Sequence, residues 1–233
     1  MDWATWAPTM TAIRAEFGYA EADDRAAAHE LRARLPAGAP PWRDLGVDIR
    51  NRRNLVIVGA GPSLAAAPAS LFVGQVTVAA DGATGRLREL GVVPHAVVTD
   101  LDGHPDALAW AAAQGSRMVV HAHGDNRPAL AALVPRLGPL VHGTHQVAPE
   151  PALEPLRNVG GFTDGDRAVM LCEELGARVG ILVGFDFDAP PSAYSHKWDP
   201  RTKPAKLAWA KRIVEGVHGR GKLHLRQWVP PAR

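Results

Sequence analysis

The feature that most constrains the fold is an alternation of short apolar runs with longer Ala- and Leu-rich stretches across residues 55–183. The apolar runs are rich in Val and have the length of single strands. Strands that are apolar along their whole length are typical of a parallel sheet covered by helices on both faces. The sequence therefore predicts an α/β fold with a mostly parallel sheet. We expect strands at 55–58, 76–79, 96–99, 118–122, 140–143 and 179–183, and helices near 83–90, 105–114, 128–137 and 163–175.

The first 50 residues have a different character. Ala, Arg, Glu and Leu dominate residues 1–36, and Ile13 and Phe17 stand four residues apart, as on one helical face. A second helix is predicted from Glu21 to Leu35, with acidic residues in its first turn. The Pro- and Gly-rich segment 36–41 then breaks the chain. We therefore predict an N-terminal helical cap at residues 1–50 and an α/β main domain at residues 51–233.

The composition argues against several classes of partner. The net charge is only +2 and the sequence has no basic run, so we predict no nucleic-acid partner. No apolar run approaches the roughly 20 residues that span a bilayer, and the N-terminus does not resemble a secretory signal, so we predict no membrane partner. A single cysteine, Cys172, fits a reducing compartment. These features predict a cytoplasmic protein whose partners are small molecules, with a homo-oligomer as an open option.

Two carboxylates follow the third predicted strand, in the segment Thr99-Asp100-Leu101-Asp102. Side chains two residues apart on a strand point to the same face, so we expect Asp100 and Asp102 to project together from the strand end. Two like charges at that spacing repel each other, and a divalent cation reverses the sign of the interaction. Mg²⁺ is typically held by one or two carboxylates together with substrate phosphates. The segment predicts a Mg-nucleotide site, and the alternative is a polar turn after a buried strand.

A glycine-rich segment with Gly59, Gly61 and Ser63 follows the first predicted strand. Glycines allow backbone N–H groups to approach a phosphate, and a helix N-terminus adds a favourable dipole. Asp81 lies about 20 residues further on, where a ribose-binding acid stands in a dinucleotide site, but the third glycine of that motif is missing. The segment therefore predicts either nucleotide contact or a tight turn. Asp81 is predicted to cap a helix or to bind ribose, a metal or a substrate amine.

Two histidines on one strand face end the fourth predicted strand. His121, His123 and Asp125 are similar in pattern to the ligands of metallo-hydrolases, but Asn126 stands where a further histidine is expected. A dizinc site is therefore a minor alternative. The other interpretations are contact with phosphates, a second Mg²⁺, or a helix cap at Asn126 with histidines that merely end a strand.

The segment before the helix at 163–175 carries two glycines, a threonine, two carboxylates and an arginine. Thr163 with Asp166 fits a helix capping box, although Glu or Gln is the usual partner, and capping can coexist with a function. Asp164 and Asp166 repeat the spacing of two carboxylates two residues apart, and Gly161 precedes them. Arg167 is a candidate for neutralising phosphate charge in a transition state.

Two further motifs, with weaker support, complete the set of candidate site residues. Thr144 and Gln146 follow the fifth predicted strand and could contact a phosphate, although a turn would have the same composition. Lys203 and Lys206 stand at the start of a predicted C-terminal helix, after a Pro-rich loop. A basic loop that folds over phosphates is a common lid, and a solvated charged face is the alternative.

The order of these motifs resembles that of the archaeal-type 6-hydroxymethyl-7,8-dihydropterin pyrophosphokinase family. The motifs span residues 58–211 and read V-G-A-G-P-S-L, A-D-G-A, V-T-D-L-D-G, H-A-H-G-D-N, G-T-x-Q, G-G-F-T-D-G-D-R-A and K-x-x-K-L-x-W-A-K. This family is similar to the catalytic domain of thiamin pyrophosphokinase, so the resemblance implies a Rossmann-like, thiamin-pyrophosphokinase-like fold in which residues 51–233 are catalytic. It also implies ATP, Mg²⁺ and transfer of diphosphate to a reduced pterin with release of AMP, in folate or methanopterin biosynthesis. It assigns nothing to the N-terminal helices.

The resemblance also implies roles for the carboxylates. Asp100 and Asp102 would hold Mg²⁺, and Asp81 and Asp125 would hold a second ion or its waters. The other residues expected to contact ATP or the pterin lie at strand ends and helix starts: Gly59, Gly61, Ser63, His121, His123, Asn126, Thr144, Gln146, Gly161 and Thr163.

The same resemblance implies that the basic side chains are catalytic groups. Arg167, Lys203 and Lys206 would stabilise the β- and γ-phosphates, and Asp164 or Asp166 would bind metal or the guanidine-like edge of the pterin. A thiamin-type diphosphokinase and a glycosyltransferase-like protein that uses a nucleotide sugar are the alternatives. A non-catalytic dinucleotide-binding module is a third, against which the missing glycine and the many strand-end carboxylates count.

Overall fold

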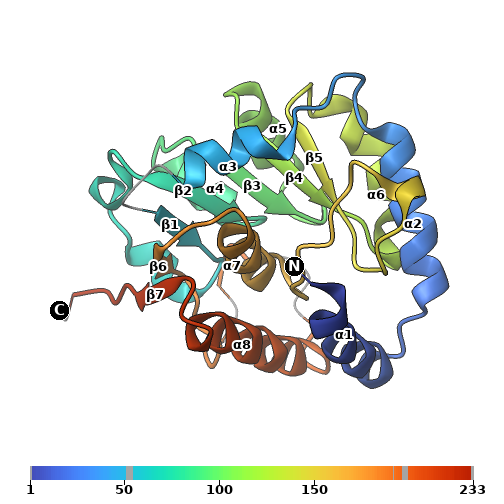
Figure 1. Cartoon of the computed structure of the whole chain (residues 1–233). Helices are drawn as coiled ribbons and strands as arrows, with labels where there is room; N and C mark the ends of the chain where they lie inside the picture. Colours follow the sequence, from blue (N-terminus) through green and yellow to red (C-terminus); the bar gives the residue numbers. More distant parts are fainter. Residues whose placement is uncertain (1, 51–54, 191, 196–198, 232–233) are drawn as a thin grey trace.

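The computed structural model describes residues 2–50, 55–190, 192–195 and 199–231. The domain boundary predicted between residues 50 and 51 therefore adjoins residues outside this description. Within it, strands and helices alternate along most of the chain after three initial helices (Figure 1). The predicted α/β class is confirmed.

The sheet has seven strands in the described residues, and every neighbouring pair is parallel. Their spatial order is β5-β4-β3-β2-β1-β6-β7. The chain thus adds β2 to β5 on one side of β1 and then crosses back to place β6 on the other side. The strands are β1 (Leu55–Val58), β2 (Val76–Ala80), β3 (Ala96–Thr99), β4 (Arg117–His121), β5 (Val141–Thr144), β6 (Val179–Val183) and β7 (His224–Gln227).

Helices cover both faces of the sheet, as the apolar strands predict. One core cluster joins α1 (Trp3–Phe17), α3 (Trp42–Arg50), α7 (Asp164–Glu174) and α8 (Lys203–Gly219) to one face. A second cluster joins α2 (Glu21–Arg34), α4 (Ala83–Glu89), α5 (Pro105–Ala113) and α6 (Arg127–Leu133) to the other. Alternate residues of one strand enter different clusters: Leu55 and Ile57 enter the first, Val56 and Val58 the second. This is why the central strands show no polar alternation.

The N-terminal helices contribute to both clusters. Trp6, Met10 and Ile13 of α1 are buried in the first, and Ala27 and Leu31 of α2 in the second. α2 packs beside α6 and β5, at one end of the strand order (Figure 1). Among the described residues, no helix is long and apolar enough to cross a membrane.

A buried histidine gives the fold a pH-dependent stability. His142 of β5 lies beside Trp42 of α3, with ring centroids 4.9 Å apart, and neither ring nitrogen has a hydrogen-bond partner among the described residues. Burial, reinforced by the charge of Arg117, lowers the pKa of His142 to about 4. The unfolded chain, with a histidine pKa near 6.5, therefore binds more protons than the folded chain between these two values.

We expect the free energy of unfolding to fall as the pH drops from about 6.5 to about 4. His142 should contribute about 2 kcal/mol of this loss by pH 5, at 1.36 kcal/mol per pKa unit. Urea titrations of the wild type and of His142→Phe at pH 7 and pH 5 would measure it. The variant should lose less stability than the wild type over this interval, and equal losses would contradict the prediction.

Candidate active site

The strand order changes direction at β1, whose neighbours are β2 and β6. Ligands of open parallel sheets bind beyond the carboxyl ends of the strands at such a point. Here the glycine segment after β1 meets the segment after β6: Gly59 donates its N–H to Val183 O at 2.8 Å, and Gly61 donates to Gly184 O at 2.8 Å. A Cβ at Gly59 or Gly61 would overlap the carbonyl oxygen of Gly184. These glycines are therefore required by the close approach of two backbones.

The segment after β1 forms a short 3-10 turn, Pro62–Ala66, in place of the long helix of a dinucleotide site. The backbone N–H of Ser63 donates to the Asp186 carboxylate at 2.8 Å, and the Ser63 hydroxyl is buried without a partner among the described residues. Ser63 is not among the residues that line the cavity described below. Its structural role is thus to fasten the β1 turn to the β6 segment.

Gly184 should be intolerant of a side chain. Its φ is +73°, and a Cβ there would overlap the carbonyl oxygen of Gly59. We expect Gly184→Ala to lower the free energy of unfolding by about 2 kcal/mol or more, because both strain and overlap must be relieved by backbone movement. The midpoint of urea unfolding would measure this. Gly219→Ala at the end of α8, where a Cβ meets nothing within 4 Å, is the matched control and should be close to neutral.

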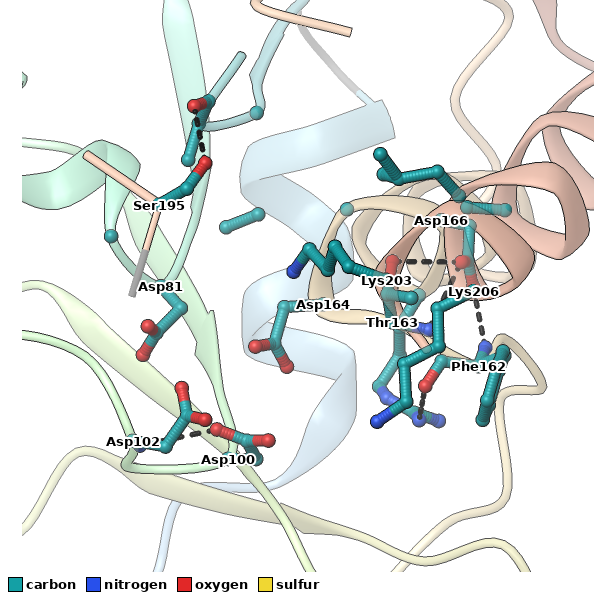
Figure 2. A pocket seen from close by; sticks show the side chains of 18 of the residues that line it. Asp81, Asp100, Asp102, Phe162, Thr163, Asp164, Asp166, Ser195, Lys203 and Lys206 are labelled. Carbon is teal, nitrogen blue, oxygen red and sulfur yellow. Dashed lines mark hydrogen bonds between the residues drawn. The ribbon is translucent and has the colours of Figure 1, made fainter. Parts of the chain in front are cut away.

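A cavity of about 480 Å³ lies beyond the carboxyl ends of the strands. Its wall comes from the segments after β1 to β6, from the turn between α1 and α2, and from the first turns of α7 and α8. Figure 2 shows the side chains that project into it. Most of the predicted site residues line it, but Ser63, Asn126, Thr144 and Gly161 do not.

Three carboxylates gather on one side of this cavity. Asp81, at the end of β2, joins Asp100 and Asp102, and one ligand oxygen from each lies within 4.8 Å of the others. The pair after β3 comes together for a different reason than the one we predicted. β3 ends at Thr99, and Leu101 adopts a left-handed φ of +69°, so that a turn rather than strand alternation sets the positions of Asp100 and Asp102. The backbone N–H of Asp102 closes that turn by donating to Asp100 at 3.1 Å.

Asp81 is held in place by its neighbours on β3. It too has a positive φ, +37°, which is uncommon outside glycine and typical of functional sites. The Thr99 hydroxyl donates to the Asp81 carboxylate and accepts the backbone N–H of Leu101 at 2.8 Å. One buried hydroxyl therefore links the two strand ends that carry the carboxylates.

The proximity of these charges changes their proton affinities. Burial, and then the charge of Asp100, raise the pKa of Asp81 to about 7. Burial alone would also raise the pKa of Asp100, but its hydrogen bond to His123 and the charge of that ring outweigh burial and lower the pKa to about 2. Burial, with Asp100 and Asp81, raises the pKa of Asp164 well above its usual value. A cation bound among these groups would remove this mutual repulsion.

The donor set suits Mg²⁺. All three groups offer carboxylate oxygens, the ligands that this hard cation prefers, and no histidine or cysteine joins them among the described residues. Asp125 is not part of the group, and its side chain is exposed on the neighbouring loop. The dizinc alternative, which requires histidine ligands at this loop, has no such cluster in the described part of the chain.

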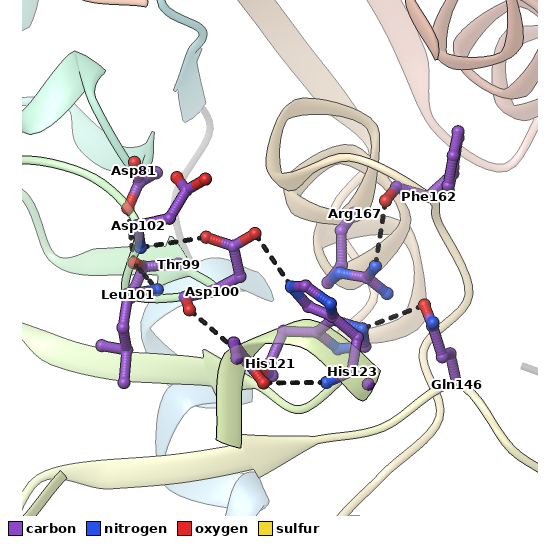
Figure 3. A network of polar contacts seen from close by, with 12 residues as sticks. Asp81, Thr99, Asp100, Leu101, Asp102, His121, His123, Gln146, Phe162 and Arg167 are labelled. Carbon is purple, nitrogen blue, oxygen red and sulfur yellow. Dashed lines mark hydrogen bonds and ion pairs between the residues drawn. The ribbon is translucent and has the colours of Figure 1, made fainter. Parts of the chain in front are cut away.

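The segment after β4 supports Asp100 (Figure 3). The His123 ring nitrogen Nε2 lies 3.1 Å from the Asp100 carboxylate. The Asn126 amide donates to the backbone oxygens of Asp100 at 2.8 Å and His121 at 2.7 Å, and it accepts the N–H of His123. Asn126 thus fastens the ends of β3 and β4 together from outside the cavity.

His121 belongs to a buried network that reaches the N-terminal helices. Its Nε2 lies 3.2 Å from Gln146 Oε1, and Gln146 Nε2 donates to Asp24 of α2 at 2.9 Å. Its other ring nitrogen lies 3.0 Å from the Thr144 hydroxyl. Burial, and then the charge of Arg167, lower the pKa of His121 well below its usual value. His121 is therefore neutral, and Gln146 Oε1 accepts a hydrogen bond from its Nε2–H. Thr144 contacts the His121 ring but does not line the cavity.

The carboxylates at the start of α7 have different surroundings. Asp166 accepts the backbone N–H groups of Phe162 and Thr163 and the Thr163 hydroxyl, and so completes the predicted capping box. Asp164 instead faces the carboxylates of Asp81, Asp100 and Asp102 (Figure 2). The structure thus separates the two residues between which the sequence left the choice open.

Arg167 makes backbone contacts that the sequence did not predict. It lines the cavity but is only 1% exposed, and its guanidinium donates to Gly160 O at 3.0 Å and Phe162 O at 3.3 Å. A Cβ at Gly161, which has a φ of +88°, would lie 2.5 Å from Arg167 Cα. Arg167 therefore shapes the Gly160–Phe162 turn (Figure 3). These two bonds use two of the five guanidinium N–H groups, and Nε has no partner among the described residues.

Lys203 and Lys206 extend from the first turns of α8 into the cavity (Figure 2). Lys206 Nζ lies over the rings of Tyr19 and Phe162, 5.7 and 5.8 Å from their centroids. The predicted pair of basic groups thus faces the carboxylates from the opposite side of the same cavity.

The sequence missed the contribution of the N-terminal helices. Gly18, with a φ of +70°, ends α1 and turns the chain, so that Tyr19 and Asp23 line the cavity. Asp24 accepts hydrogen bonds from the Gly124 N–H and from Gln146, and it pairs with Arg14 at 3.0 Å. The polar residues in the first turn of α2 could have indicated this contribution, but stabilisation of the helix end explains such residues equally well.

The chain matches the family model described as "6-hydroxymethylpterin diphosphokinase MptE-like" over residues 35–191. The chain belongs to this family. Three curated relatives named 6-hydroxymethyl-7,8-dihydropterin pyrophosphokinase support the assignment. The protein of Pyrococcus furiosus is 40% identical and covers 95% of this chain and 96% of its own length. Those of Methanothermobacter thermautotrophicus and Methanocaldococcus jannaschii are 36% and 34% identical, covering 98% and 92% of this chain and 100% and 95% of their own lengths.

A solved structure shares the fold of this chain. The MAf glycosyltransferase from Magnetospirillum magneticum AMB-1 superposes with a TM-score of 0.52 at 15% sequence identity. The match covers 92% of this chain and 39% of the glycosyltransferase chain. At this identity the likeness establishes the α/β architecture and carries no information on the reaction.

Proposed function

We propose that this protein transfers a diphosphate group from Mg-ATP to the hydroxymethyl group of 6-hydroxymethyl-7,8-dihydropterin and releases AMP. The observation that carries the proposal is the group of Asp81, Asp100 and Asp102, which faces two lysines across one cavity at the strand ends. The names of the curated relatives supply the substrate. Neither a pterin nor AMP follows from the carboxylates alone.

Transfer of a diphosphate group asks the protein mainly to position reactants and to balance charge. The acceptor hydroxyl attacks the β-phosphorus, the bond between that phosphorus and the oxygen bridging to the α-phosphate breaks, AMP leaves, and the hydroxyl proton is released to solvent. Asp81, Asp100 and Asp102 would hold Mg²⁺, which would supply positive charge to offset that of the phosphates. Lys203 and Lys206 place positive charge on the other side of the same polyphosphate.

The chain's own hydrogen bonds keep this arrangement in place. His123 and Asn126 fix the side chain and the backbone of Asp100, and Thr99 fixes Asp81. Because these partners come from the scaffold, the carboxylates need little reorganisation when substrate binds.

One reaction panel tests the proposal. The protein is incubated with ATP and Mg²⁺ and with the reduced pterin, thiamin or no acceptor, and adenine nucleotides are separated by chromatography. We expect AMP to accumulate only with the pterin, and to disappear when EDTA removes Mg²⁺. AMP formation with thiamin but not with the pterin would overturn the proposal and favour a thiamin-type diphosphokinase.

A further inference from the structure

The cavity extends to both sides of the carboxylates, and we call these two parts its arms. Asp81, Asp100 and Asp102 follow β2 and β3, at the centre of the strand order. The segments after β1 and β6 form one wall, and the segment after β4 forms the other together with the α1–α2 turn. Figure 2 shows Ser195 and Phe162 on opposite sides of Asp164. On the proposed function, each arm takes one substrate, because the transferred diphosphate lies between nucleotide and acceptor.

The first arm is built largely from backbone. Gly59, Gly61 and Gly184 line it, and the Ser195 hydroxyl, which donates to Ala60 O at 3.2 Å, closes it. Tyr194 also belongs to this arm, and its hydroxyl donates to Glu89 at 2.9 Å. A glycine-lined crevice at the switch in strand order is the usual position of a nucleotide in such sheets.

The second arm is aromatic. Tyr19 and Phe162, which are separated by most of the chain, both line it, with ring centroids 6.4 Å apart. Phe17 supports both rings from behind, at 5.7 Å from Tyr19 and 5.1 Å from Phe162, without lining the cavity itself. Lys206 also lines the cavity and its Nζ lies over both rings, so the ring faces are turned toward this lysine. Flat ring faces of this kind bind flat heterocycles by stacking.

Two carboxylates stand at the same arm without partners. Asp23 and Asp125 line the cavity, are exposed, and make no hydrogen bond or ion pair with the described residues. They lie on one wall, because a Cβ at Gly124 would be 2.8 Å from Asp23 Cβ. A pterin presents an amino group and a ring N–H side by side, and carboxylate oxygens accept from such a donor pair.

We propose that Tyr19 and Phe162 bind the pterin ring and that Asp23 and Asp125 accept its donor edge, so that the α1–α2 turn determines acceptor specificity. The proposal rests on the diphosphokinase function proposed above. It makes the N-terminal helices part of the active site, beyond the catalytic groups that the motifs of the main domain supply. The acceptor then extends toward the central carboxylates, and ATP enters from the glycine-lined arm.

The test compares the same substitution in the two arms. Tyr19→Leu and Phe162→Leu should each raise the KM for the pterin about tenfold or more, since one stacking contact commonly accounts for that factor. The KM for ATP should change by less than about threefold. Tyr194→Leu makes the same change in the other arm and should alter the KM for ATP more than the KM for the pterin.

A direct binding measurement separates recognition from catalysis. Calorimetric titration of the pterin, with Mg²⁺ and a non-hydrolysable ATP analogue present, should show weaker binding to Tyr19→Leu and Phe162→Leu at a temperature well below the unfolding midpoint of each variant. Asp23→Asn with Asp125→Asn should weaken the same binding. If the wild type forms AMP from the pterin but neither aromatic variant loses pterin affinity, the acceptor site is overturned and the proposed function stands. If the wild type forms no AMP with the pterin, the proposed function itself fails.

Discussion

Replacing Asp102 by Asn should lower kcat/KM by about 1,000-fold while leaving the protein folded. The substitution keeps the size of the side chain but removes one of three carboxylates whose ligand oxygens lie within 4.8 Å of one another. Removal of a single preorganised electrostatic group from a transition state commonly costs about 100- to 1,000-fold in rate, and loss of a metal ligand adds to this. AMP release at varied pterin and Mg²⁺ concentrations would measure the loss.

In the absence of Mg²⁺, the same substitution should leave the unfolding midpoint unchanged or raise it. Three clustered negative charges repel one another in the folded state, and this repulsion helps raise the pKa of Asp81 to about 7. Added Mg²⁺ should raise the unfolding midpoint of the wild type and have less effect on Asp102→Asn, because a ligand that binds the folded state stabilises it. Asp106→Asn, an exposed carboxylate on α5 outside the cavity, is the control. Full activity in Asp102→Asn would contradict the assignment of the metal site.

The predictable part of the fold is the part that is buried on both faces. The six strands from β1 to β6 were predicted because each is a short run of apolar residues, and two-sided burial selects such runs. β7 was missed because it is an edge strand whose side chains are mostly exposed, so burial places little constraint on His224 and Arg226. α3 was missed because it follows directly after the Pro- and Gly-rich break, although Leu45 and Ile49 sit four residues apart on its buried face.

The predictable part of the site is the set of polar residues that follow strands. Parallel strands end on one edge of the sheet, so Asp81, Asp100 and His123 could be placed near one another from the chain order alone. The conformation of each turn was not predictable. The left-handed backbone of Leu101, not strand alternation, sets the geometry of the Asp100–Asp102 pair.

Contacts between distant segments lay beyond the sequence. Tyr19 meets Phe162 because α1 packs on the first core cluster, and Asp24 meets Gln146 because α2 packs beside α6 and β5. No local pattern encodes that docking, since an acidic first turn on α2 also stabilises the helix alone. The burial of Arg167 could not be predicted either, because the sequence pattern of an arginine after a capping box is the same whether its side chain contacts a ligand or backbone carbonyls.

Replacing Lys203 by Met should lower kcat/KM by about 100-fold, the second largest effect that we expect. Lys203 lies in the first turn of α8 and projects into the cavity toward Asp164 (Figure 2), so in the proposed reaction its charge offsets that of the transferred phosphates. Met retains most of the apolar stem, so helix packing should persist and the unfolding midpoint should change little. Lys211→Met on the same helix removes an exposed lysine that pairs with Asp188 and does not line the cavity, and it should retain near-normal activity. A charge that acts only in the transition state changes kcat more than KM. Equal losses of kcat/KM in Lys203→Met and Lys211→Met would therefore contradict the prediction, and so would a change confined to the KM for ATP. Either result would show that Lys203 contributes general positive charge and does not specifically stabilise the reacting phosphates.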